Sequence, residues 1–143
     1  MPRKARWFVP GVVYHLIPRF VENRWFMKGA LEREYYLSLL GRAVTDSDWS
    51  LISYGLMSSH THLEVIAGEQ PLEDWLRRVH TPFADMINRT NDRIGPVFVR
   101  GPAAHPTPMD RVGELLAYLR LVDAQLEYQR ARADLAAARG TAD

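Results

Sequence analysis

The 143-residue sequence contains no cysteine. A disulfide framework is therefore excluded, and the composition suits a reducing compartment. No apolar run approaches the about 20 residues that a membrane-spanning helix needs, and the basic start is not followed by the apolar core of a signal peptide. We therefore expect a cytoplasmic protein with no membrane partner.

An excess of charge of either sign is also missing, because 18 basic side chains stand against 17 acidic ones. The resulting net charge of +1 does not by itself predict a nucleic-acid binder. The basic residues are nevertheless grouped along the chain, which fits either a face that contacts DNA or ordinary solvated charge. The basic residues that we predict for a DNA-binding face are Arg3, Lys4, Arg6, Arg19, Arg77, Arg78, Arg89 and Arg93.

The apolar residues predict one globular domain with a single core, since they make up 47% of the chain. Segments in which apolar and polar residues alternate are predicted to be strands, and segments in which apolar residues recur every three or four positions are predicted to be helices. Pro82 lies within the second helix and predicts a kink or two shorter helices. The expected strands cover residues 11–19, 49–57, 60–67 and 94–99, the expected helices 30–45, 71–91 and 110–138, and an irregular loop 102–109.

The order strand, helix, strand, strand, helix, strand is typical of a ferredoxin-like α/β fold, an α+β arrangement around one sheet. In the first helix we expect Leu31, Tyr35, Leu39 and Leu40 to form the apolar face. Tyr35 and Tyr36 are adjacent and cannot share a face, so one of them is expected in the core and the other at the surface.

Residues 53–66 predict a strand, a tight turn and a second strand. Because side chains alternate along a strand, His60, His62 and Glu64 share one face, and the opposite face is apolar enough to pack on helices. Three interpretations fit the two histidines: surface residues, a structural zinc site, or an open metal site. Structural zinc is disfavoured because it needs four ligands. An open site would polarise a phosphate oxygen.

The residues around these histidines resemble a known family. Residues 56–63, LMSSHTHL, resemble the LMPNHVHLLV signature of HUH single-strand DNA nucleases, in which one residue separates two histidines. The start, PRKARWFVPG followed by YHLIPR, resembles the opening of the REP-associated tyrosine transposases and their single-tyrosine relatives. The resemblance extends over about residues 1–101, with mild departures at Ser59 and Thr61.

This resemblance implies an antiparallel sheet with helices on one face and the HUH motif on a central strand. Residues 1–109 would form the HUH transposase-like domain, and residues 110–143 a long C-terminal helix and tail. His60 and His62 would hold a divalent ion, Mn²⁺ or Mg²⁺, against the scissile phosphate of single-stranded or hairpin DNA. The implied activity is DNA nicking and strand transfer during transposition. Some relatives are dimers, so a homodimer is one expectation.

The family attacks the phosphate with a tyrosine, and this sequence has none at the expected position. Pro102 stands there, and no tyrosine occurs between Tyr54 and Tyr118. Tyr118 is the candidate nucleophile nearest in sequence, although it matches a tyrosine that reads as packing in the family. Tyr128 is the weaker candidate.

Other residues have two interpretations each. His15, in a strand that is apolar on both faces, is either a core residue or a neighbour of the histidine pair. Trp25 and Phe26 stack on unpaired bases or belong to the core. His105 is either an additional metal ligand or an exposed loop residue.

Three functions follow from these alternatives. The first is an active transposase-like nuclease, impaired if no tyrosine replaces the missing one. The second is a catalytically inactive DNA-binding remnant or regulator that recognises hairpin or single-stranded DNA. The third is hydrolysis by activated water, with Glu64 or Glu114 assisting the two histidines.

Overall fold

The computed structural model describes residues 7–108 of the chain. The predicted helix 110–138, the C-terminal tail, Tyr118 and Tyr128 lie outside it, as do Arg3, Lys4 and Arg6. Within the described part, strands and helices follow one another in the predicted order. The elements are β1 (Val13–Ile17), the 3₁₀ turn η1 (Val21–Asn23), α1 (Ala30–Thr45), β2 (Ser50–Leu56), β3 (Thr61–Ile66), α2 (Leu72–Thr90) and β4 (Ala103–Pro106).

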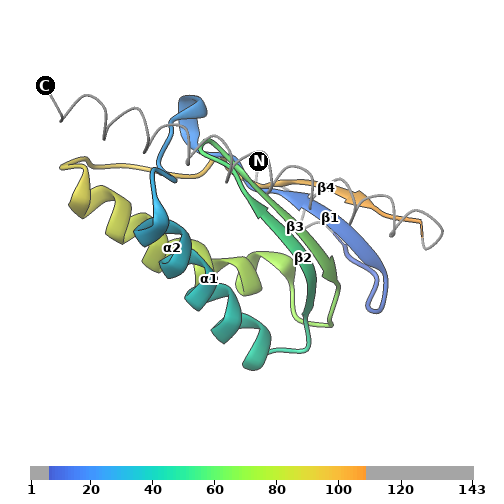
Figure 1. Ribbon diagram of the computed structural model, residues 1–143. Coiled ribbons are helices and arrows are strands. Elements are labelled where there is room, and N and C mark those ends of the chain that lie inside the picture. Colours follow the sequence, from blue (N-terminus) through green and yellow to red (C-terminus); the bar gives the residue numbers. More distant parts are fainter. Residues whose placement is uncertain (1–6, 109–143) are drawn as a thin grey trace, which may run out of the picture.

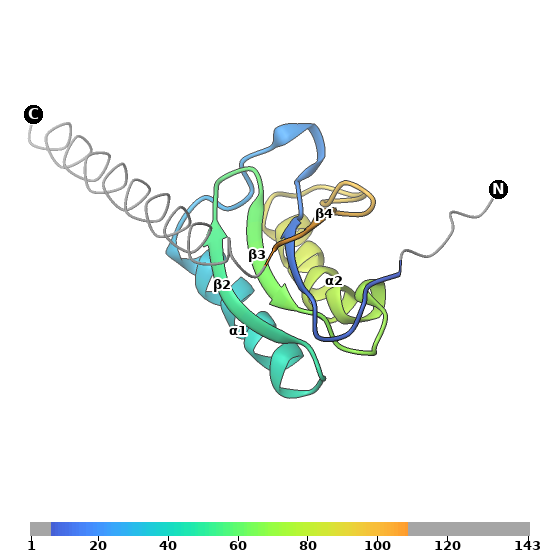
Figure 2. The same ribbon diagram turned by 90° about the vertical axis from the view of Figure 1, so that its right-hand side faces the viewer.

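The four strands form one sheet in the order β2-β3-β1-β4, and every neighbouring pair is antiparallel. Both helices cover the same face of this sheet (Figure 1). Figure 2 shows the strands side by side in front of the two helices. The predicted ferredoxin-like α+β fold is therefore confirmed, and β3, which follows His60, is a central strand.

The core lies between the sheet and the helices. Helix α2 buries an apolar stripe at helical spacing, which includes Trp75, Val79 and Phe83. The Trp75 ring stacks on Trp49 with a centroid distance of 5.2 Å, and its indole N–H donates to the Ala43 carbonyl of α1. These contacts join the start of α2 to α1 and to the segment before β2.

Helix α1 has the predicted bounds, but its buried face differs from the expected one. Tyr36 is fully buried, whereas Leu31 is 71% exposed. The buried stripe passes through Tyr36, Leu40 and Ala43, and five residues of helix turn Leu31 about 140° away from Tyr36. Tyr36 is the core residue of the two adjacent tyrosines, whereas Tyr35, expected at the surface, is partly buried and packs against the core.

Helix α2 runs without a break from Leu72 to Thr90 with Pro82 inside it, so the alternative of two shorter helices is wrong. Proline lacks the N–H that would bond the carbonyl of Arg78 four residues earlier. Val79 and Phe83, on either side of this defect, are both fully buried in the core. Residues on both sides of Pro82 are therefore anchored in the same core.

The last strand lies later in the sequence than predicted. Residues 94–99 form only an isolated bridge between Phe98 and Phe20, and Ile94 is 98% exposed. Strand β4 instead falls in the segment expected to be an irregular loop, where it pairs with β1 alone. Proline is tolerated on an edge strand because the outer side of such a strand makes no hydrogen bonds to a neighbouring strand. Pro106 can therefore stand opposite Tyr14.

Candidate metal centre on the sheet face opposite the helices

The hairpin between β2 and β3 places the two histidines. The turn closes with a hydrogen bond from the Met57 N–H to the His60 carbonyl of 2.9 Å. His60 bridges to Arg19, and His62 is the second residue of β3. Thr61 and Leu63 are fully buried toward the helices. Alternation therefore turns His60 and His62 to the other face, as predicted.

The two imidazoles converge. Their Nε2 atoms lie 3.2 Å apart, and the rings meet edge to face at 76°. Two nitrogens bound about 2.1 Å from one ion lie about 3.0 Å apart at a right angle and about 3.4 Å apart at the tetrahedral angle. The observed separation falls between these limits, so the pair fits two adjacent positions around one divalent ion.

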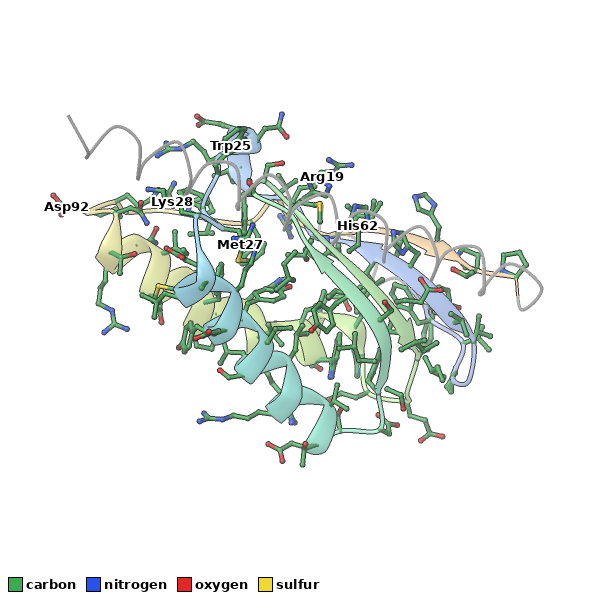
Figure 3. All side chains as sticks on the ribbon, viewed as in Figure 1. Arg19, Trp25, Met27, Lys28, His62 and Asp92 are labelled. Atoms are coloured by element: carbon green, nitrogen blue, oxygen red, sulfur yellow. The ribbon has the colours of Figure 1, made fainter. Side chains whose placement is uncertain are left out.

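Both imidazoles are held in the neutral form that metal binding needs. Burial lowers the pKa of His62 to about 4, and the positive charges of His60, His15 and Arg19 add to this effect. Burial and then the charge of Arg19 lower the pKa of His60 as well. Figure 3 shows Arg19 and His62 on the same side of the sheet. Near neutral pH neither imidazole carries a positive charge that would repel a divalent ion.

Within residues 7–108, no three His, Asp or Glu side chains form a group that could hold a metal ion. His105 stands opposite His15 in the β1–β4 register and is exposed. The described residues thus supply a two-nitrogen site, in which the remaining coordination positions would fall to water, to a phosphate oxygen or to residues outside this range.

His15 extends the histidine pair into a longer chain of contacts. Its Nε2 lies 2.9 Å from His62 Nδ1, and its Nδ1 lies 3.1 Å from Glu64 Oε2. At the other end, the Ser59 hydroxyl lies 3.0 Å from His60 Nδ1. Of the two interpretations of His15, the structure supports the neighbour of the histidine pair.

Sequence reasoning placed Glu64 on the polar face but missed its burial. The Glu64 side chain is fully buried, and its Oε1 atom has no hydrogen-bond partner in the described residues. The β1–β3 register puts His15 directly opposite Glu64. A histidine at the middle of one apolar strand and a glutamate two residues after His62 were the only signals in the sequence, and neither one reveals the pairing.

The four tyrosines of residues 7–108 all belong to the helix side of the sheet or to α1. Tyr14 and Tyr36 are core residues, and Tyr35 lies against Phe83. Tyr54 stands opposite Leu63, and directly opposite residues share a face. In this range, therefore, no tyrosine hydroxyl belongs to the histidine face. The candidate nucleophile Tyr118 lies outside the described residues.

The predicted DNA-binding arginines do not share one face. Arg19 is exposed beside His60, whereas Arg77 and Arg78 project from α2 on the helix side of the sheet. Arg77 pairs with Asp74 at 3.4 Å, and Arg78 donates to the Asp46 carbonyl. Arg89 is exposed in the last turn of α2. Only Arg19 of these four stands next to the histidine pair.

Arg93 follows α2 in the chain and lies against the loop between η1 and α1. Phe26 of that loop is a core residue at 1% exposure, while Trp25 is 71% exposed. The guanidinium groups of Arg24 and Arg93 lie 5.2 and 4.9 Å from the centre of the Phe26 ring. The open question about the two aromatics is thus settled in part: one is core and the other is available for stacking.

This loop is tied to the turn that carries the histidines. The Met27 N–H of the loop donates to the Ser58 carbonyl at 3.2 Å, and the N–H of Phe20, just before η1, donates to the Ser59 carbonyl at 3.0 Å. Figure 3 shows Trp25 projecting from the loop at the end of the sheet where this turn lies. The exposed indole and the histidine pair are therefore parts of one end of the molecule.

Known proteins resemble this chain in structure and hardly in sequence. No protein-family model and no curated protein matches it. The structure of a REP-associated tyrosine transposase bound to a REP hairpin aligns with a TM-score of 0.64 at 8% identity, over 87% of this chain and 74% of the other. The chain has the fold of that transposase.

A candidate transposase from Deinococcus radiodurans R1 aligns with a TM-score of 0.55 at 15% identity, over 85% of this chain and 98% of its own. The two structural alignments show that the chain has this fold, and identities this low show nothing about its activity. Within residues 7–108, no helix has the length and apolar character needed to cross a bilayer.

Proposed function

We propose that this chain is a transposase-like protein that binds single-stranded or hairpin DNA and positions one phosphate of the strand with a divalent ion held by His60 and His62. The observation that carries the proposal is the 3.2 Å separation of the two Nε2 atoms on a protein with a transposase fold. The tyrosine transposase that shares this fold is bound to a REP hairpin in its own structure. That association makes hairpin DNA the first ligand to test.

The chemistry of the ligands favours a particular metal. Mg²⁺ prefers oxygen ligands in near-octahedral geometry, whereas imidazole nitrogen suits Mn²⁺ and later transition metals better. Such an ion, when bound, would withdraw charge from a phosphate oxygen. His60 and His62 would orient it, and Arg19 beside them would add positive charge toward the same phosphate.

The DNA strand would continue from the histidine pair toward Trp25. An exposed indole stacks on an unpaired base, and the guanidinium groups of Arg24 and Arg93, which lie against the neighbouring Phe26 ring, would attract the backbone. Replacing Trp25 by Ala should weaken binding of single-stranded DNA by about 1–3 kcal/mol for each base stacked on it. Trp7, which is 94% exposed, gives the matched control in Trp7→Ala. Equal losses in both variants would contradict this path.

The covalent reaction of the family that the sequence resembles uses a tyrosine, and Tyr118 is the candidate nucleophile for it. Its phenol oxygen would lose its proton to solvent and attack phosphorus, the phosphorus–oxygen bond to the 3′ oxygen would break, and the leaving 3′ oxygen would take up a proton from solvent. The products would be a 5′-phosphotyrosine and a free 3′ hydroxyl. The test is incubation of hairpin-flanked single-stranded oligonucleotide with Mn²⁺, followed by a denaturing gel.

The gel separates the candidate functions. An adduct that survives denaturation, and that vanishes in both His62→Ala and Tyr118→Phe, supports the proposal. An adduct that persists in Tyr118→Phe assigns the attack to another residue. Cleaved ends without an adduct support attack by activated water.

The second candidate function is an inactive DNA-binding remnant or regulator. Two observations favour it: Pro102 occupies the position where the family carries its tyrosine, and no tyrosine within residues 7–108 belongs to the histidine face. Its signature is a hairpin-DNA complex without cleavage, in which affinity falls steeply as salt rises because phosphate contacts release counterions. Light scattering of the free protein and of this complex would test the predicted homodimer.

A further inference from the structure

Glu64, His15, His62 and His60 form a continuous chain of side-chain contacts across three segments. Glu64 Oε2 lies 3.1 Å from His15 Nδ1, His15 Nε2 lies 2.9 Å from His62 Nδ1, and His62 Nε2 lies 3.2 Å from His60 Nε2. The rings of His15 and His62 are stacked at a centroid distance of 5.0 Å. Each nitrogen of the two inner imidazoles therefore faces a different neighbour.

The direction of these hydrogen bonds follows from Glu64. An ionised carboxylate only accepts, so the His15 nitrogen that faces it, Nδ1, carries the proton. A neutral His15 then offers only a lone pair at Nε2, and His62 Nδ1 must donate to it. A neutral His62 with its proton on Nδ1 has its lone pair on Nε2, the atom that faces His60.

The burial of the Glu64 carboxylate is energetically unfavourable and needs an explanation. Its side chain is fully buried and one carboxylate oxygen has no partner in the described residues. Burying an ionised carboxylate is unfavourable unless it is paired, and its one described partner is His15. An apolar residue opposite position 15 would satisfy packing alone, so the carboxylate points to a role toward the histidines.

We propose that Glu64 and His15 are positioning residues that fix the tautomer of His62, so that its Nε2 lone pair faces the point where a metal ion would sit between His60 and His62. Metal-bound histidines commonly donate their second ring N–H to a partner that sets the tautomer, and loss of that partner costs about 10–100-fold in metal affinity. Here the partner is a second imidazole, itself set by a carboxylate. This inference deepens the proposed metal site and rests on it for its purpose, but the tautomer itself is a property of the metal-free protein.

The first measurement is ¹⁵N NMR of the histidine rings in metal-free protein at pH 8, above the ordinary histidine pKa of about 6.5. The expected result is a proton on Nδ1 of His62 and on Nδ1 of His15. A proton on Nε2 of His62 in the wild-type protein would overturn the inference. A doubly protonated His15 would overturn it as well.

The second measurement is Mn²⁺ affinity by calorimetry for the double variant H15F/E64M. Replacing both members of a buried pair by apolar residues of similar volume is often tolerated, whereas a single replacement leaves a buried charge. Affinity should fall about 10–100-fold, and His62 should lose its fixed Nδ1 proton. The control H105F alters the histidine that stands opposite His15 on β4, and it should leave both readouts unchanged.

Glu64→Gln provides a second variant in case H15F/E64M does not fold. The amide can either donate or accept, so His62 should become a mixture of tautomers, with an affinity between those of the wild type and the double variant. Wild-type Mn²⁺ affinity and tautomer in both variants would overturn the inference. If the wild type shows the Nδ1 proton on His62 but binds no Mn²⁺, the proposed metal site fails, whereas the tautomer set by Glu64 and His15 is supported.

Discussion

Strand β3 contributes to a network of polar side chains on each of its two faces, and the two networks differ in the surroundings of their histidines. On the helix side, Thr61 Oγ1 lies 3.3 Å from the Tyr36 hydroxyl, which lies 3.0 Å from His80 Nε2. On the other side, His62 joins His60 and His15. One strand thus holds a histidine-containing network in the core and another on the face that we propose for DNA.

The environment of the rings separates the two networks. The His80 ring stacks on Phe98 at a centroid distance of 3.8 Å, and its Nε2 faces a tyrosine hydroxyl. No second imidazole nitrogen is recorded beside it in the described residues, so the arrangement satisfies buried polar groups. His60 and His62 instead turn two nitrogens toward one point. A histidine in a network becomes a candidate ligand only when another ligand atom converges with it.

The largest effect that would sharpen this comparison is expected on metal binding. His62→Ala removes one of the two converging nitrogens. Loss of an outer-shell partner can lower metal affinity about 100-fold, so loss of a ligand itself should lower the affinity for Mn²⁺ by at least that factor. His80→Leu, on the opposite side of β3, should bind Mn²⁺ as the wild type does. Calorimetry on both variants checks this, and a similar loss in His80→Leu would contradict the separation of the two networks.

The next effect concerns acid stability. Burial lowers the pKa of His80 to about 3, against about 6.5 in an unfolded chain. Between these values the unfolded state binds more protons, so the free energy of unfolding should be highest above pH 6.5. It should fall by at most about 1.4 kcal/mol per pH unit for this group as the pH drops.

His62, with its pKa lowered to about 4, adds to the same trend over a shorter window. Urea denaturation between pH 4 and pH 8 measures the slope, and His80→Leu should flatten it more than His62→Ala. A profile that is identical in the wild type and in His80→Leu would show that the ring is not held neutral in the core.

A smaller effect is expected from Tyr36→Phe. Burial raises the pKa of Tyr36, so its hydroxyl stays protonated and bonds Thr61 and His80. Removing it leaves the buried Thr61 hydroxyl and the partly buried His80 ring without that partner, at a cost of about 1–3 kcal/mol. Chemical denaturation measures this loss, while Mn²⁺ affinity should not change. A drop in Mn²⁺ affinity would mean that the core network supports the histidine face.

The smallest effect is expected from single arginines. Arg19→Ala removes a charge beside His60, and it should weaken hairpin-DNA binding slightly and reduce the salt slope by about one. Arg77→Ala, on the helix side and already paired with Asp74, is the matched control and should leave the slope unchanged. Binding isotherms at several salt concentrations decide between them, and equal changes would place DNA on both faces.

Local pattern was enough to predict several elements. The helix expected over residues 30–45 is α1, with those bounds, and the alternation around His60 and His62 assigns their faces correctly. Both signals depend on backbone geometry that repeats every few residues. The ferredoxin-like order followed from them, and the resemblance around the histidines agreed with the structural neighbours.

What the pattern could not predict depends on strand pairing and packing between distant segments. The contact between His15 and Glu64 comes from the β1–β3 register, and β4 formed where proline argued for a loop because an edge strand needs hydrogen bonds on one side only. The pattern likewise could not tell on which side of the sheet the arginines of α2 lie. Arg77 and Arg78 are close to the histidines in sequence, but α2 places them on the opposite side of the sheet.

The sequence by itself determined that two histidines stand one residue apart on a strand. It also determined the side of that strand on which they lie. Tertiary structure alone decided that their Nε2 atoms stand 3.2 Å apart and that a buried carboxylate reaches them through a third imidazole. The physical reason is range. Face and period are set by neighbouring peptide units, whereas a distance between side chains is set by the register and twist of strands that are far apart in the chain.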